Sequence, residues 1–391
     1  MKGCLVPRIV HILAIGIFAM VTSEFTVSGL MPQLAGELHT DVQAIGYLVS
    51  VFALAMAIGG PVLASLLLRL PHRRALLILF GIFLAGNALA ASAPSYSVLL
   101  VARVVTGAAS GAFFGIAVTA AGHAVPPKLR SRATASALQG LALGTTLGLP
   151  LATWVGGHWG WRSAFVVIGA LTVVAAAATA AGMPDETHAD SSPRLREQAQ
   201  VFRSRRLWAT MATSTLIIGA TFAGFSYFTP ILQTETGVDL GVVPLLLLAY
   251  GTATIAGNAV VGRLAGRYTL SVLVIGTILS ALFLTVFAVA AEHAWAAIPA
   301  MLGIGLVGVT MNPAMVTRVQ RIGNTGALVN TVHASMITLG VVLGSALGGF
   351  GTAVSGLRAP LWIGAGLALL AVASMIPDLL RSRPTHSPEL V

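Results

Sequence analysis

Basic residues occupy every second junction between the long apolar runs of this chain. All but three of its 22 Lys and Arg residues lie at these junctions, the exceptions being Arg103, Arg162 and Arg358. The intervening junctions carry acidic residues, at Glu37, Asp41, Glu235, Asp239 and Glu292. This alternation is typical of a chain that crosses a bilayer repeatedly, because short cytoplasmic loops collect Lys and Arg. We therefore expect a multi-pass protein of the cell (inner or cytoplasmic) membrane with both termini in the cytoplasm.

Composition supports an all-α integral membrane protein. Of 391 residues, 56% are hydrophobic and only 9% are charged, and the mean hydropathy is +0.90, whereas soluble chains carry roughly 25% charged residues. One span needs roughly 20 residues, so about twelve spans use most of the chain. The net charge of +10 lies in short loops, where it favours orientation and contact with membrane lipids over nucleic acid binding. We expect no nucleic acid partner.

Twelve transmembrane helices are expected in two sets of six. The expected spans are 8–30, 42–68, 75–93, 96–122, 133–156, 163–183, 208–231, 241–264, 270–290, 295–317, 326–350 and 359–379. The first is longer than the apolar core of a signal peptide, so we interpret it as a retained helix. The polar stretch between the sets indicates a flexible linker. The expected domains are an N-terminal bundle at 1–183, a cytoplasmic linker at 184–206 and a C-terminal bundle at 207–391.

The two halves carry matching motifs at matching positions. An Arg-x-x-x-Arg motif is expected in the loop between the second and third spans and again between the eighth and ninth, at Arg69 and Arg73 and at Arg263 and Arg267. Glycine recurs every fourth residue in the fifth and eleventh spans, at Gly140, Gly144 and Gly148 and at Gly340, Gly344 and Gly348. Such ladders let a neighbouring helix approach closely. We interpret the halves as pseudo-symmetric six-helix bundles around a central cavity.

Three spans also carry short motifs in which polar or charged residues, glycine and proline recur at fixed spacings. The first reads Thr22-Ser23-Glu24-Phe25 and then Gly29-Leu30-Met31-Pro32. The fourth reads Leu99-x-x-x-Arg103-x-x-Thr106-Gly107, and the fifth reads Gly144-x-x-x-Gly148-Leu149-Pro150. In these residues the chain resembles the major facilitator superfamily, and more narrowly its twelve-span drug:proton antiporters of the actinobacterial and chloramphenicol-exporter type. It departs from that pattern at Thr106, where the family has Gln, and at Leu68 and Gly262, where an acid usually precedes the first loop arginine.

The resemblance implies a proton-coupled antiporter that exports a small hydrophobic or amphipathic organic compound by alternating access. It implies a monomer that is not an enzyme and needs no cofactor besides the proton gradient, with protons, a small-molecule substrate and membrane lipids as partners. The residues assigned to packing and conformational change are Arg69, Arg73, Gly107, Gly144, Gly148, Pro150, Arg263 and Arg267. Two alternatives stay open, namely a facilitator or importer of a sugar or small metabolite, and a non-transporting membrane receptor or scaffold.

Two charged residues are expected well inside the hydrocarbon layer. A central charge costs about 2.5–3.5 kcal/mol on insertion scales, so it needs a partner or a water-filled cavity. Glu24 and Arg103 each lie about seven residues from the outer end of a span, which places both roughly 10 Å below the surface. The functional hypothesis is that Glu24 carries the proton and Arg103 modulates it. The alternative is a static buried ion pair that holds two helices in register.

A second group of residues is predicted to line the substrate cavity. Aromatic rings with a few polar groups suit an amphipathic organic substrate, and the candidates are Phe25, Gln139, Phe222, Phe225, Tyr227, Asn312, Asn330 and His333. Packing is the alternative for each ring. Asn312-Pro313 is expected to break the tenth helix, and His333 is a candidate second proton site because imidazole titrates near neutral pH. Neither a metal site nor a catalytic constellation is expected.

Overall fold

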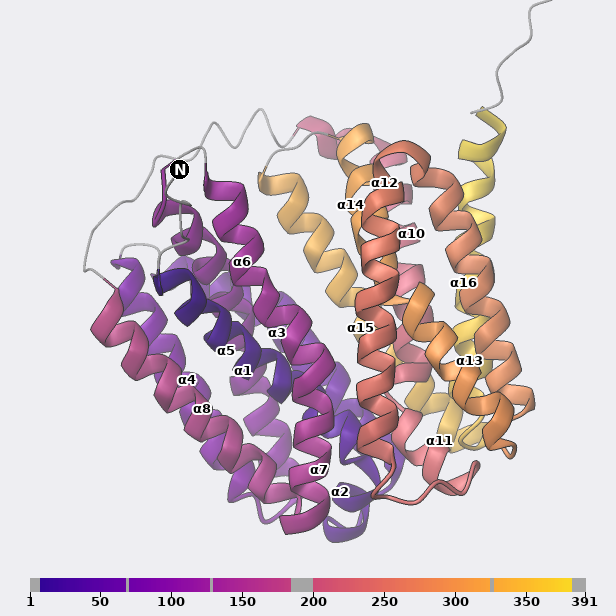
Figure 1. The fold of residues 1–391 in the computed structure, drawn as a ribbon, viewed down its shortest axis with the longest axis horizontal. Helices are drawn as coiled ribbons and strands as arrows, with labels where there is room; N and C mark the ends of the chain where they lie inside the picture. The colour runs from indigo at the N-terminus through magenta and orange to yellow at the C-terminus, as the bar shows by residue number, and fades with distance from the viewer. Residues whose placement is uncertain (1–7, 68–69, 127–128, 184–199, 324–326, 382–391) are drawn as a thin grey trace, which may run out of the picture.

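The structure is a computed structural model that describes residues 8–67, 70–126, 129–183, 200–323 and 327–381. Within these ranges it contains helices and no strand. The helices form two bundles that lie side by side, one from the first half of the chain and one from the second (Figure 1). The predicted all-α class with paired bundles is therefore confirmed.

Each half contains long helices and one pass that is interrupted partway, the fifth in the first half and the tenth in the second. The first half comprises α1 (Arg8–Gly29), α2 (Met31–Glu37), α3 (Val42–Leu67), α4 (His72–Ala91), α5 (Tyr96–His123), α6 (Arg130–Leu143), the π-helical turn η2 (Gly144–Gly148), α7 (Leu149–Trp159) and α8 (Trp161–Gly182). The second comprises η3 (Gln200–Arg203), α10 (Arg205–Phe225), α11 (Phe228–Thr234), α12 (Val243–Val289), α13 (Ala294–Val307), η4 (Val309–Met311), α14 (Asn312–Ile322), α15 (Ala327–Ser355) and α16 (Ala359–Arg381).

The junction between the eighth and ninth spans lies where it was predicted but is tighter than a loop, because α12 consists of two helices that meet at a kink and Arg263 and Arg267 lie in helical backbone. Only Tyr268 departs from helical geometry there, with φ −120° and ψ 37°. The chain nevertheless reverses at this kink. A Cβ added at Gly257 would meet Leu306 and Thr310, and one added at Gly276 would meet Met311, so the two arms of α12 lie beside the same turn. Two passes therefore meet with no intervening loop.

Twelve passes result once the interrupted helices are counted. Ten helices of the described chain are long and apolar enough to cross a membrane. One of them is α12, which makes two passes. The remaining pass is the fifth, where η2 divides the helix into α6 and α7, each shorter than a span. Pro150 directly follows η2, where the hydrogen-bond pattern of the helix is already altered by the π-helical turn.

The two glycine ladders pack in the same way in the two halves. In the first half the ladder faces α1, and a Cβ on Gly140 would meet the carbonyl oxygen of Ala14. In the second half the ladder of α15 faces α10, and a Cβ on Gly344 would meet the carbonyl oxygen of Gly219. The fifth pass therefore packs on the first as the eleventh packs on the seventh, so the close-packing role predicted from spacing is present in both bundles.

One arginine ties the loops of each half together at the end that carries Glu37 and Glu235, which we call the acidic end. Arg162 donates from Nη1 to Oε2 of Glu37 at 2.8 Å and from Nη2 to the carbonyl oxygen of Ala93 at 3.0 Å. Arg358 donates from Nε to Oε2 of Glu235 at 2.6 Å and from Nη2 to Oε1 of Glu292. We call these the arginine clamps. They account for two of the three arginines outside the basic junctions.

Backbone geometry repeats with the clamps. The described residues with φ in the left-handed region are His39 at 49°, Gly160 at 82°, Gly237 at 71° and Gly356 at 84°. His39 and Gly237 each lie two residues after the clamp glutamate, and Gly160 and Gly356 each lie two residues before the clamp arginine. Glycine adopts this conformation without steric cost, which explains three of the four. The duplication therefore extends to the backbone of the connecting turns.

Candidate functional site

Arg103 of α5 binds the main chain of α1. Its side chain is 1% exposed. Nη1 donates to the carbonyl oxygen of Ser23 at 2.8 Å, and Nη2 donates to that of Glu24 at 2.9 Å. The guanidinium also lies over the Phe52 ring of α3, 4.1 Å from its centroid. Carbonyl dipoles and an aromatic face thus compensate this buried cation.

Glu24 lies beside Arg103 without pairing its carboxylate to it. Within the described chain no ion pair within 4.0 Å and no hydrogen bond joins the Glu24 carboxylate to another side chain, and the residue is partly exposed. The structure therefore brings together the two predicted charges, but through the backbone of Glu24. An unpaired carboxylate of this kind retains its capacity to take up a proton.

Asn87 of α4 completes this site and was not identified from the sequence. Its side chain is 1% exposed, and its Oδ1 accepts a hydrogen bond from Ser23 Oγ at 3.3 Å. Its Nδ2 donates to the carbonyl oxygen of Phe83 at 2.9 Å. The available signal was one Asn within the otherwise apolar third span. The sequence does not say which helix such a residue faces.

Aromatic rings from both halves meet one residue from Glu24. The Phe25 ring of α1 stacks with Phe222 of α10 at 6.0 Å and meets Phe225 edge-on at 5.5 Å. Phe225 in turn stacks with Tyr250 of α12 at 5.2 Å. We call these four residues the aromatic cluster. Three of them are predicted cavity residues, and all four are at least nine-tenths buried, so in this conformation they close the seam between the bundles.

Two further contacts join the bundles beside the cluster. The Oγ atoms of Ser50 on α3 and Ser345 on α15 lie 2.7 Å apart. Thr146 of η2 donates to the carbonyl oxygen of Gly251 on α12 at 3.3 Å. Tyr227, a predicted cavity residue, donates to the carbonyl oxygen of Ser345 at 2.8 Å and is fully buried. It therefore packs at the inter-bundle contact.

The other predicted cavity residues do not share one environment. Gln139 is exposed on α6. Asn330 accepts from Gln320 Nε2 at 3.0 Å, within the second half. His333 is 2% exposed, with its Nε2 2.9 Å from Ser214 Oγ of α10. The structure therefore places His333 and Asn330 in hydrogen bonds inside the second bundle, away from Glu24.

The tenth pass is interrupted as predicted, but the break begins earlier than Asn312-Pro313. Gly308 leaves helical geometry with φ −80° and ψ −100°, and η4 follows before α14 resumes at Asn312. Asn312 Oδ1 is buried without a hydrogen-bond partner. The break lies against α10, because a Cβ on Gly308 would meet the Thr221 side chain.

The predicted motif residues are distributed over packing and surface positions. Arg73 donates to the carbonyl oxygen of Ala180 on α8 at 2.5 Å, Gly107 packs against the Phe52 carbonyl, and Arg263 and Arg267 are exposed on α12. Arg69 lies outside the described residues. In the second half, Asp378 of α16 accepts hydrogen bonds from Arg206 at 3.0 Å and Arg318 at 2.8 Å.

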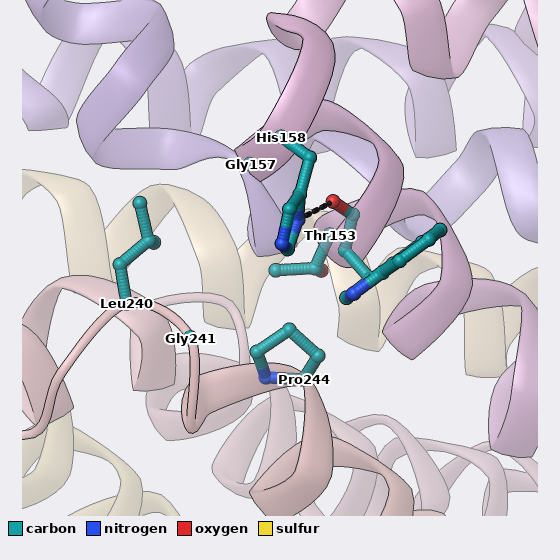
Figure 2. Close-up of a pocket in the computed structure, with 7 residues that line it drawn as sticks. Thr153, Gly157, His158, Leu240, Gly241 and Pro244 are labelled. Atoms are coloured by element: carbon teal, nitrogen blue, oxygen red, sulfur yellow. Dashed lines mark hydrogen bonds between the residues drawn. The ribbon is translucent and has the colours of Figure 1, made fainter.

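A small pocket of about 160 Å³ lies on the seam between the bundles. Figure 2 shows His158 of α7 facing Pro244 across it, with the His158 ring hydrogen-bonded to the Trp154 carbonyl at 2.9 Å. Leu240 and Gly241, in the loop before α12, line the opposite wall. The pocket is separate from the Glu24–Arg103 site. Among the described residues, no cluster of His, Cys, Asp and Glu is arranged to hold a metal ion.

Comparison with known proteins gives consistent matches. A family model described as Major Facilitator Superfamily matches residues 13–334. The chain is 33% identical over 365 residues to an uncharacterized MFS-type transporter, YtbD, of Bacillus subtilis (strain 168), with 92% of each chain covered. It is 30% identical to a chloramphenicol resistance protein of Streptomyces lividans, with 95% of each covered.

A solved structure shares the fold. A bacterial homologue of the human lysosomal transporter Spinster, in an inward-facing and unoccupied conformation, superposes with a TM-score of 0.74 at 15% identity. The match covers 95% of this chain and 98% of that structure. At this identity the likeness concerns the fold alone.

Proposed function

This chain belongs to the major facilitator superfamily, and from that premise we propose that it is a proton-coupled antiporter that exports a small hydrophobic or amphipathic organic compound. It is a multi-pass membrane transporter and not an enzyme. The observation that carries the proposal is the free Glu24 carboxylate beside the carbonyl-bound Arg103. An ionisable residue inside a membrane span is rare and costly, which supports a functional role for Glu24.

The mechanism follows from the position of Glu24 at the seam. Its neighbour Phe25 belongs to the aromatic cluster that closes the seam in this conformation. When the bundles rock apart at this end, the cluster separates and the solvent access of Glu24 changes. Proton uptake on one face and release on the other would then be coupled to movement of substrate in the opposite direction.

Export of a drug-like compound is supported by one relative in particular. The Streptomyces lividans protein, to which 95% of this chain aligns, is named for chloramphenicol resistance. The aromatic cluster provides an apolar surface suited to a ring-containing substrate. Chloramphenicol is therefore the first probe.

Proteoliposomes containing a pH dye test the proposal. An imposed proton gradient should drive chloramphenicol against its concentration gradient, and chloramphenicol should drive proton release in return. Glu24→Gln should abolish both. Asp41→Asn is the matched control, because it removes an exposed carboxylate at the acidic end. Flux that persists after the gradient is collapsed would favour the facilitator, and unchanged coupling in Glu24→Gln would remove Glu24 from the mechanism.

A further inference from the structure

We propose that Asn87 is a positioning residue for proton exchange at Glu24 and that it acts through Ser23. This inference rests on the proposed function, because it assigns a residue that sets the conditions under which Glu24 takes up its proton. Asn87 lies on α4, and its hydrogen bonds within the described chain go to Ser23 and to the Phe83 carbonyl, not to the Glu24 carboxylate. Its effect must therefore pass through the backbone of α1.

The Asn87 side chain has a fixed orientation. Its Nδ2 donates to the Phe83 carbonyl one turn earlier on the same helix, at 2.9 Å, and its Oδ1 accepts from Ser23 Oγ at 3.3 Å. Both Asn87 and Ser23 are buried, at 1% and 0% exposure. A buried side-chain hydrogen bond between two helices is costly to leave unmade, so it fixes the rotation of α1 relative to α4 at this residue.

The same residue of α1 supplies a partner to Arg103. The Ser23 carbonyl oxygen accepts from Arg103 Nη1 at 2.8 Å, and the next carbonyl, that of Glu24, accepts from Nη2 at 2.9 Å. Helix α4 is also held against α5, since a Cβ on Gly86 would meet the Thr106 side chain. Asn87 therefore braces α1 from a helix that is packed on the helix carrying Arg103.

The position of α1 affects the ionisation of Glu24 because few charged groups surround this turn. The groups around this turn of α1 and Arg103 come from α3, α4, α5, η2 and α10, and they are Leu48, Phe52, Asn87, Arg103, Gly148, Phe222 and Phe225. Arg103 is the single charged side chain among them. Its distance from the Glu24 carboxylate is therefore the charge contact that a movement of α1 would change.

Loss of the Asn87–Ser23 hydrogen bond should shift the titration of Glu24 in one direction. While α1 is held, Arg103 donates to three carbonyl oxygens, those of Ser23 and Glu24 on α1 and that of Leu48 on α3. If α1 rotates or shifts, the guanidinium can turn to the carboxylate, and a closer cation favours the charged form. Glu24 should then take up its proton only at lower pH. A purely structural role for Asn87 would reduce stability without moving this titration.

Infrared difference spectroscopy on the full chain in phospholipid nanodiscs tests the inference without any drug. The protonated carboxyl band that Glu24→Gln removes is followed through a pH titration. In Asn87→Leu and in Ser23→Ala its midpoint should move to lower pH by about half a unit or more. The double variant should shift no further than the larger single shift, because both remove one link. Thr172→Val, which deletes a buried hydroxyl bonded within its own helix, should leave the midpoint unchanged.

The outcomes separate this inference from the proposed function. An unshifted midpoint in both single variants overturns the role of Asn87, even where transport slows. If Asn87→Leu does not accumulate, Ser23→Ala carries the same test with the loss of a single hydroxyl. A wild-type spectrum with no Glu24 band overturns the proposed function itself.

Discussion

Arg358 and Glu235 stand in the same relationship as Arg162 and Glu37 in the other half of the molecule. In each pair an arginine at the start of a bundle's last helix donates to a glutamate that follows the bundle's first pass. The second half differs in one respect, because Glu292 supplies a carboxylate where the first half uses the Ala93 carbonyl. The clamp of the second half therefore carries an additional negative charge.

This additional carboxylate predicts a pH dependence of stability. The hydrogen bond and charge of Arg358 hold the pKa of Glu292 below its ordinary value of 4.5. The folded state thus binds this proton less readily than the unfolded state, so the contribution is present above pH 4.5 and is lost as pH falls through the lowered pKa. Glu292→Gln should lower the melting temperature slightly at neutral pH, because exposed ion pairs contribute little.

Melting curves of wild type and Glu292→Gln across an acid titration check this. The difference should be constant from neutral pH down to mildly acidic pH, should decline below pH 4.5 and should vanish below the lowered pKa. Asp41→Asn is the control for removal of an exposed carboxylate. A difference that grows on acidification would contradict the assignment.

The glycine ladders should not tolerate a methyl group. Gly344→Ala would press a Cβ onto the Gly219 carbonyl, and Gly140→Ala would press one onto the Ala14 carbonyl. Overpacking of this kind typically costs about 1–3 kcal/mol. Detergent-solubilised variants should melt lower and elute earlier or aggregate in size-exclusion chromatography. Gly115→Ala, at a helical glycine with open space around it, should behave as wild type or better.

A cysteine pair should lock the seam between the bundles. The Oγ atoms of Ser50 and Ser345 are 2.7 Å apart, so the two side chains point at each other across the seam, as the two cysteines of a disulfide must. In a Cys4→Ser background, Ser50→Cys with Ser345→Cys should cross-link on oxidation and stop transport, and reduction should restore it. Each single cysteine is the control. Full transport by the oxidised, cross-linked protein would show that the seam need not open.

The native cysteine reports topology. Cys4 precedes the first helix and is the single cysteine of the chain, so the proposed cytoplasmic N-terminus predicts that a membrane-impermeant maleimide leaves it unlabelled in intact cells and labels it in inverted vesicles. Trp159→Cys in a Cys4→Ser background is the opposite control, because Trp159 is 66% exposed at the other end of the bundle. Labelling of Cys4 in intact cells would reverse the proposed orientation.

Much of the fold could be predicted from periodic features. Apolar runs predicted the passes, and glycine spacing predicted close helix contacts, because both are repeated patterns of side-chain type. The reversal near Tyr268 was predictable, because the expected spans at 241–264 and 270–290 leave it between them. The helical backbone at Arg263 and Arg267 was not predictable, because both residues resemble loop residues. Exclusion of the cations from the membrane core requires only that they lie near its surface, and a helix end satisfies this as well as a loop does.

The site was predictable only in part. Glu24 and Arg103 are conspicuous because charges are rare in apolar spans, and their shared depth follows from helix rise. The manner of their contact was not predictable, since a carbonyl acceptor is present at every residue and leaves no signature in the sequence. Asn87 was missed for a related reason, because one amide in a span indicates a polar contact without identifying its partner.

The carbonyl contacts of Arg103 have a consequence for how this region can diverge. Because the acceptors at positions 23 and 24 are peptide oxygens, no replacement of either side chain removes them outright. The side chains at positions 23 and 24 can therefore be substituted during evolution while Arg103 keeps both carbonyl partners on α1. The path of the main chain is constrained instead. A proline or an inserted residue in this turn would disturb the Arg103 contacts more than most side-chain substitutions would.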